Sequence, residues 1–204
     1  MDMVSVSAHK FGGPKGVGVL AVREAAAGKL APRAIGGGQE RERRSGTQNV
    51  AAIVGMAEAA RVTAATRSAT NERVAKLRDR LVDALLASVP EVIETGAAAD
   101  PSDAAVDADA REGRIAGTVH LCIAGIESES LLFLLERDEV YASAASSCAS
   151  GAQEPSHVLS AMGVPRALAL GSLRLSLGDA SSDADVEAAV AAIPPAVARL
   201  RAFV

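Results

Sequence analysis

The sequence has 204 residues, of which 49% are hydrophobic and 23% are charged, with a formal net charge of −4. The acidic excess disfavours a nucleic-acid-binding protein, because such proteins need a basic face to neutralise phosphates. No apolar run reaches the ~20 residues that span a bilayer, and no signal peptide or disulfide framework is visible, so we expect a cytoplasmic protein that contacts neither nucleic acid nor membrane.

Two short strands are predicted near the start of the chain, at residues 3–8 and 16–24. The segment between them, FGGPKG, is rich in glycine and proline, which favour a turn. Residues 28–47 have no periodic pattern and contain three consecutive glycines, a proline and many charges. We interpret this segment as an ordered, functional loop, since structureless connections of this length are uncommon in compact domains.

A helical pattern runs from about residue 48 to residue 88, with Ser45 or Thr47 as the candidate N-cap. Whether residues 65–71 break it into two helices stays open. Farther along, strands are predicted at 91–96, 118–126, 140–144 and 172–178, and helices at 127–138, 154–163 and 182–204, the last disturbed by Pro194 and Pro195. This alternation predicts the α/β class, with helices covering one or both faces of a sheet. The Asp-rich segment 97–115 is predicted to be a flexible surface insertion.

The first candidate for chemistry is Lys10, which follows the first predicted strand and precedes the glycine-rich turn. A desolvated lysine amine can form an imine with a carbonyl, and the neighbouring Ser7 and His9 could hold a phosphate or an aromatic ring. An isolated lysine is more often an ordinary surface residue. Here the glycines would permit another molecule to approach the backbone closely.

Three further residues are candidates for either a chemical or a structural role. Cys148 lies among alanine, serine and glycine, so its thiol is either inert or a mobile nucleophile. Cys122 lies in an apolar strand, where we expect a buried, unreactive side chain. Arg174 interrupts an apolar strand and shares one strand face with Ser172 and Ser176, so it either faces solvent or pairs with a carboxylate.

The loop GGGQERERRSGT could bind an anion through backbone N–H groups, because a helix is predicted to start near Thr47. The alternative is a solvated, charged loop. His120 and His157 are expected to be structural or surface residues. The spacing of histidines and cysteines predicts no metal site.

In chain order, four motifs resemble those of one family: SAHKFGGPKGVG, GGGQERERRSGT, SSCASGAQEPSHVLSAMG and SLRLSLG. They are similar to the C-terminal half of cysteine desulfurases of the NifS/IscS type, fold-type I pyridoxal-phosphate enzymes related to class V aminotransferases. The resemblance implies the last strands of a large-domain sheet within residues 1–47. It implies a connecting helix and a complete small α+β domain within residues 48–204. Family members carry a further half-chain before the lysine, so we expect a C-terminal piece that neither binds the cofactor tightly nor turns over alone.

For the cofactor, the resemblance implies that Lys10 forms the imine with pyridoxal phosphate, while Ser7 and His9 contact its phosphate. It implies that Thr47 reaches the phosphate bound in the neighbouring subunit of a homodimer. The family usually has glycine where this chain has Glu42.

For the substrate, the resemblance implies that Arg174 holds the carboxylate of L-cysteine and that Cys148 takes the sulfur as a persulfide. The sulfur would pass to an iron–sulfur scaffold protein or a tRNA-thiolating enzyme. The predicted function is therefore that of a cysteine desulfurase, which converts L-cysteine to L-alanine. A selenocysteine lyase and a plain class V aminotransferase are related alternatives, the latter disfavoured because it would not need Cys148. An inactive module that binds sulfur acceptors is a further alternative.

Overall fold

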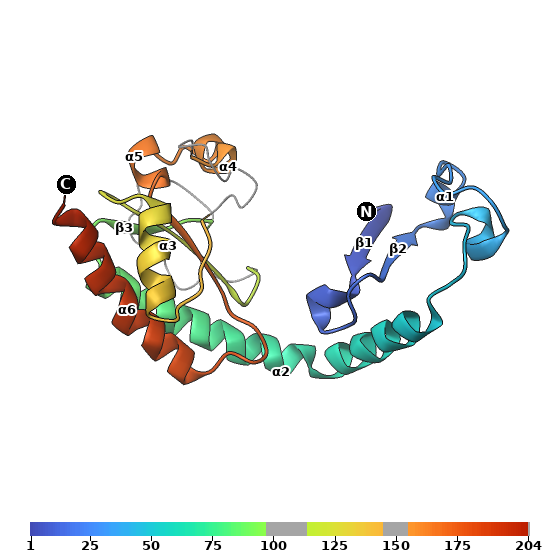
Figure 1. Ribbon diagram of the computed structural model, residues 1–204, viewed down its shortest axis with the longest axis horizontal. Helices are drawn as coiled ribbons and strands as arrows, with labels where there is room; N and C mark the ends of the chain where they lie inside the picture. The colour runs from blue at the N-terminus through green and yellow to red at the C-terminus, as the bar shows by residue number, and fades with distance from the viewer. Residues whose placement is uncertain (97–113, 145–154, 204) are drawn as a thin grey trace. The chain divides into compact units, whose positions relative to one another are not determined.

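The computed structural model describes residues 1–96, 114–144 and 155–203 (Figure 1). Within them the chain forms two compact units, Met1–Ser68 and Ala69–Val204. Cys148 and nearly all of the Asp-rich segment 97–115 lie outside the described residues. In the described part of the chain, no helix is long and apolar enough to cross a membrane.

The first unit contains a two-stranded antiparallel sheet. Strand β1 (Met3–Ser7) pairs with β2 (Gly18–Val22), and the 3-10 helix η1 (Ala8–Phe11) begins the connection between them. Both strands were predicted from their alternating, β-branched pattern. Three short helices of this unit were not predicted, η1, α1 (Glu24–Ala27) and η2 (Gln39–Glu42), because each spans only four residues.

Helix α2 (Val50–Ser88) is one continuous helix of 39 residues, which settles the question of a break at 65–71. That stretch contains neither glycine nor proline, so no residue in it strongly disfavours helix. The N-cap is Asn49, whose Oδ1 accepts a hydrogen bond of 3.1 Å from the Ala52 N–H. The predicted N-caps Ser45 and Thr47 are therefore wrong, since an equally suitable capping residue lies nearer the helix.

The second unit contains a three-stranded antiparallel sheet in the order β3 (Val92–Glu94), β4 (Thr118–Ile123) and β5 (Ser172–Ser176). Its helices are α3 (Ser128–Arg137), α4 (His157–Ala161), α5 (Arg166–Ala169) and α6 (Asp183–Arg201). The strand predicted at 140–144 is wrong. Val140 still completes the end of α3 through a 2.9 Å hydrogen bond to the Leu135 carbonyl, and only Ser143 bridges to β5.

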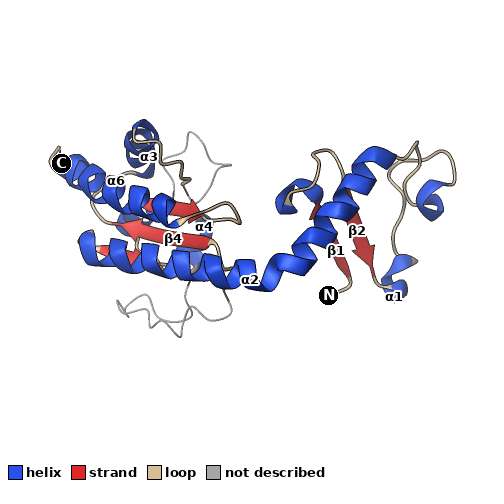
Figure 2. Cartoon of the chain, turned by 90° about the horizontal axis from the view of Figure 1, so that it is seen from below, coloured by secondary structure: helices blue, strands red, loops and turns tan. Residues whose placement is uncertain are grey.

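Alternation along β4 and β5 gives this sheet two different faces. One face contributes Val119, Leu121, Ile123, Leu173 and Leu175 to the main core, together with residues of α2, α3 and α6. The opposite face carries Cys122, which packs with apolar residues of the α4–α5 region. Figure 1 shows α4 and α5 on the other side of the sheet from α2 and α6, and Figure 2 shows α2 and α6 running along β4.

Local signals at two helix ends agree with the sequence. Ser182 begins α6 with a capping box in which its N–H and hydroxyl both donate to Asp185 Oδ2, at 2.7 and 2.9 Å. The helix continues through Pro194 and Pro195. Gly163 follows α4 with a φ of 77°, the left-handed conformation that ends helices.

Candidate functional site

One group of predicted residues lies where β1 ends. Ser7 closes the strand, His9 and Lys10 lie in η1, and all three are exposed. Ala8 between them is fully buried and its N–H donates to the Val17 carbonyl at 3.1 Å. The buried alanine therefore anchors the turn while the polar side chains face outwards.

The glycines after Lys10 hold this turn close to Ala8. Gly12 has a φ of 84° and caps η1 through its N–H, which donates to the Ala8 carbonyl. A Cβ on Gly13 would lie 2.9 Å from the Ala8 Cβ, closer than side chains tolerate. An amine, a hydroxyl and an imidazole are thus presented together on one exposed turn. This donor set fits a carbonyl compound that carries a phosphate, such as the predicted cofactor.

The loop before α2 is ordered, as predicted, and its own side chains hold it. The Ser45 hydroxyl donates to the Gly37 carbonyl at 2.6 Å, and Arg44 Nη1 donates to the Thr47 carbonyl at 3.4 Å. Glu42 has a φ of 63°, which is uncommon for a residue other than glycine. Thr47 is exposed in the same unit as Lys10.

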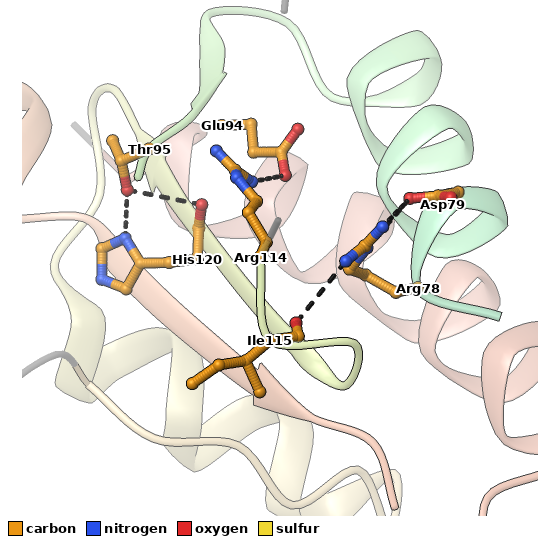
Figure 3. Close-up of polar contacts among 7 residues, drawn as sticks. All are labelled: Arg78, Asp79, Glu94, Thr95, Arg114, Ile115 and His120. Carbon is orange, nitrogen blue, oxygen red and sulfur yellow. Dashed lines mark hydrogen bonds and ion pairs between the residues drawn. The ribbon is translucent and has the colours of Figure 1, made fainter. Parts of the chain in front are cut away.

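A second group of polar residues lies on one face of the sheet in the second unit. His120 of β4 is directly opposite Arg174 of β5 in the antiparallel register, on the face turned away from the main core. Thr95, one residue after β3, donates its N–H to the His120 carbonyl at 2.9 Å. The Thr95 hydroxyl also contacts Nδ1 of the His120 imidazole ring (Figure 3).

Arg174 is only partly exposed, and its Nε is buried without a hydrogen-bond partner. Within residues 1–96, 114–144 and 155–203, no carboxylate forms an ion pair with its guanidinium. A buried donor without an acceptor costs about 1–3 kcal/mol. Of the two interpretations of Arg174, partial burial and an unsatisfied donor favour a carboxylate partner over plain solvent exposure.

Burial and charge change the titration of two groups on this face. The pKa of His120 is lowered because burial desolvates the imidazolium and because the positive charge of Arg174 repels it. Burial raises the pKa of the Cys122 thiol to about 11, against the opposing effect of a hydrogen bond with Thr95. Cys122 is fully buried, which confirms that prediction.

The backbone of Arg174 is also paired with Ser143. The Arg174 N–H donates to the Ser143 carbonyl at 2.7 Å, and the Ser143 N–H donates to the Arg174 carbonyl at 3.0 Å. Ser143 precedes Cys148 by five residues in the sequence.

The remaining buried polar contacts of Figure 3 are structural. Glu94 and Arg114 form an ion pair in which the two side chains are 0% and 14% exposed. Arg78, also buried, pairs with Asp79 and donates to the Ile115 carbonyl. Glu94 is opposite Leu121 in the register and therefore shares the core face of the sheet, away from His120.

The predicted site residues therefore fall into separate groups. Ser7, His9, Lys10 and Thr47 belong to the first unit, Arg174 belongs to the second, and Cys148 lies outside the described residues. Thr95 was not identified from the sequence, and His120 was expected only to be structural or a surface residue. The alternation of TVHLCI already distinguishes the face of His120 from that of Leu121, but the register that sets it opposite Arg174 comes from the structure. No cluster of three potential metal ligands occurs in the described part of the chain.

Comparison with known proteins supplies a family context. Residues 1–189 match the family model described as aminotransferase class-V. The chain is 45% identical to an IscS-like cysteine desulfurase of Mycobacterium tuberculosis, covering 98% of this chain and 48% of that protein. It is 41% identical to the cysteine desulfurase IscS of Methanosarcina thermophila, covering 98% and 46%. The chain thus spans about half the length of these curated relatives.

Solved structures support the same fold. A NifS-like protein matches with a TM-score of 0.78 and 32% identity, over 98% of this chain and 47% of that protein. A NifS-like protein from Rickettsia africae matches with a TM-score of 0.77 and 27% identity, over 97% and 48%. The aligned region is roughly the C-terminal half of such structures, so the predicted α/β fold class is confirmed.

Proposed function

Because the chain belongs to the class-V aminotransferase family, we propose that it carries the C-terminal part of the active site of a cysteine desulfurase. The proposed reaction converts L-cysteine to L-alanine and leaves the sulfur as a persulfide on Cys148. The proposed cofactor is pyridoxal phosphate, held by Lys10 with Ser7 and His9 at its phosphate. Thr47 would contact the phosphate site of the second subunit in a homodimer.

The observation that carries this proposal is the pairing of Arg174 with Ser143. It places the proposed carboxylate-binding residue beside the chain that leads to Cys148. A transaminase needs a carboxylate-binding arginine but no thiol close to it. The pairing therefore favours a reaction in which a cysteine acts on the bound substrate.

In this proposal each side chain has a defined task. Bound pyridoxal phosphate supplies the electron sink that makes the bonds of the amino acid labile. Lys10 holds the cofactor covalently and moves protons at Nζ, and Arg174 orients the substrate carboxylate. The Cys148 thiolate forms an S–S bond with the substrate sulfur as the Cβ–S bond breaks. The carbon keeps the bonding electrons and is protonated, which gives L-alanine without an external oxidant or reductant.

Borohydride trapping tests the assignment of Lys10. Reduction in the presence of pyridoxal phosphate should fix one cofactor on the peptide that contains Lys10, as measured by peptide mass mapping. Lys15→Ala, which removes the nearby lysine of the same turn, serves as the matched control for Lys10→Ala. Equal labelling of Lys10→Ala and Lys15→Ala would count against the assignment.

Sulfur transfer tests the assignment of Cys148. With L-cysteine and cofactor present, mass spectrometry should find the persulfide on Cys148 and sulfide release should be lost in Cys148→Ala. Cys122→Ala is the control and should keep the persulfide. Sulfide release by the wild type above the level with cofactor alone, matched by Cys148→Ala, would overturn the proposed function. The acceptor proposed for the sulfur is an iron–sulfur scaffold protein or a tRNA-thiolating enzyme.

A further inference from the structure

Among the described residues, the polar face of the second unit offers hydrogen-bond donors without a carboxylate to receive them. It carries the Arg174 guanidinium, whose Nε is buried and unpartnered, and the His120 imidazole directly across the strand pair. Side chains directly opposite each other in an antiparallel pair have Cβ atoms about 4.5–5.5 Å apart. The two residues are thus close enough to contact one small anion together.

The His120 ring is fixed by Thr95. The Thr95 hydroxyl lies closer to Nδ1 of His120 than to the His120 carbonyl, which is 3.4 Å away. We assign the hydroxyl proton to the contact with Nδ1, which makes Nδ1 an acceptor and leaves the ring proton on Nε2. In Figure 3, Nδ1 faces Thr95 and the other ring nitrogen faces away from it. The imidazole is then a neutral N–H donor on the same sheet face as Arg174.

We propose that Arg174 and His120 together form the carboxylate-binding pair of this protein, with Thr95 as the positioning residue that fixes the imidazole. The inference rests on the proposed function, since L-cysteine and L-alanine supply the carboxylate. It adds His120 as a residue that selects for the carboxylate group. One face with a guanidinium, an N–H donor and no carboxylate among its described side chains is complementary to an anion.

Binding of a carboxylate at this pair should change the pKa of His120. The positive charge of Arg174 disfavours the imidazolium, so a carboxylate bound at Arg174 would offset that charge and raise the pKa of His120. By linkage, affinity for the carboxylate rises as the pH falls through the window between the two pKa values. Other titratable or charged groups on elements at this face are Cys122 of β4, His157 of α4 and Arg166 of α5, and Tyr141 lies two residues before Ser143 in the sequence.

Histidine NMR on the full chain, with L-alanine as the unreactive probe, tests the pair without turnover. We expect the Nε2–H tautomer of His120 in the free protein and an upward shift of its pKa on addition of L-alanine. The Thr95→Val variant should lose the fixed tautomer, and Thr95→Ser should restore it. The spectra are recorded in the His157→Asn variant, which lacks the other histidine near this face. An unchanged His120 spectrum at millimolar L-alanine would overturn the proposal.

Affinities separate this proposal from the proposed function. His120→Phe should weaken L-alanine binding roughly tenfold, because a hydrogen bond to a charged group is lost, and His120→Gln should recover part of it by keeping an N–H. If Arg174→Gln abolishes binding and His120→Phe binds L-alanine as tightly as the wild type does, the pair is wrong and the proposed function stands. If Arg174→Gln binds L-alanine as the wild type does, the assignment of Arg174 in the proposed function fails as well.

Discussion

At the scale of single residues, burial separates the two cysteines more clearly than sequence spacing does. Cys122 is fully buried on the sheet face that α4 and α5 cover, and burial raises the pKa of its thiol to about 11. The thiolate is the reactive form of cysteine. Cys122 is therefore part of the hydrophobic packing, and we assign the proposed sulfur chemistry to Cys148.

Cys122 should resist alkylation in the folded protein. With a pKa of about 11, roughly one thiol in a thousand is ionised at pH 8, and the side chain is also inaccessible. Mass spectrometry after treatment with iodoacetamide should find Cys122 unlabelled under native conditions and labelled in denaturant. Rapid native labelling of Cys122 would contradict the buried, high-pKa assignment.

The cap of α6 should make stability depend on pH at the acidic end. Hydrogen bonds from the Ser182 N–H and hydroxyl lower the pKa of Asp185 below its ordinary value of 3.8. A lowered folded-state pKa contributes stability above the unfolded value, and this contribution is lost as the pH falls through the folded value. The Tm of Asp185→Asn should therefore lie below that of the wild type at neutral pH, and the gap should close under strong acid.

The control for Asp185→Asn is Glu187→Gln on the same helix. Glu187 is exposed and takes no part in the capping box, so its variant should follow the wild type throughout. A gap for Asp185→Asn that is equally large at low and at neutral pH would argue against a carboxylate cap.

At the scale of secondary-structure elements, the sequence predicts long patterns well and short or isolated features poorly. The alternation in SLRLSLG predicted β5, and Ser182 predicted the start of α6. The segment 140–144 has the composition of a strand, yet its conformation is decided by a hydrogen bond from Val140 back into α3. Likewise, nothing in the sequence shows that Thr95 meets His120, because 25 residues separate them and the contact depends on strand register.

Close approach of β5 to β4 makes Gly171 a sensitive position. A Cβ at residue 171 would run into the Ile123 carbonyl, which is backbone and cannot move aside without distorting the sheet. Gly171→Ala should therefore lower the free energy of unfolding by about 2–4 kcal/mol, as measured by urea denaturation. Gly178→Ala is the matched control, since a methyl group at residue 178 would have no atom within 4 Å of it. Equal stability of the two variants would contradict the packing described for this edge.

At the scale of the whole molecule, the two units differ in how much apolar surface they bury. The second unit has a core that combines residues of α2, α3, α6, β4 and β5. In the first unit, the buried apolar residues of the described structure are only Ala8, Ala26 and Ala52. A two-stranded sheet with so little burial is marginally stable by itself.

This difference predicts unequal independent folding. Residues 69–204 expressed alone should unfold cooperatively with urea and give a dispersed NMR spectrum. Residues 1–68 alone should not, because three buried alanines cannot offset the conformational entropy of ordering the segment. The full chain provides the reference spectrum. A cooperative transition from residues 1–68 alone would show that the first unit contains more stabilising contacts than the structure describes.

The two-faced sheet also bears on how such a protein can diverge. From these two strands the main core takes Val119, Leu121, Leu173 and Leu175, whereas His120 and Arg174 occupy intervening positions. If the proposed carboxylate site is correct, replacements at those intervening positions can change ligand preference while the hydrophobic layer, and with it the fold, is left intact. Selection can therefore act on specificity and on stability through different residues of β4 and β5. A one-residue insertion in β4, by contrast, would exchange the two sets and damage both properties at once.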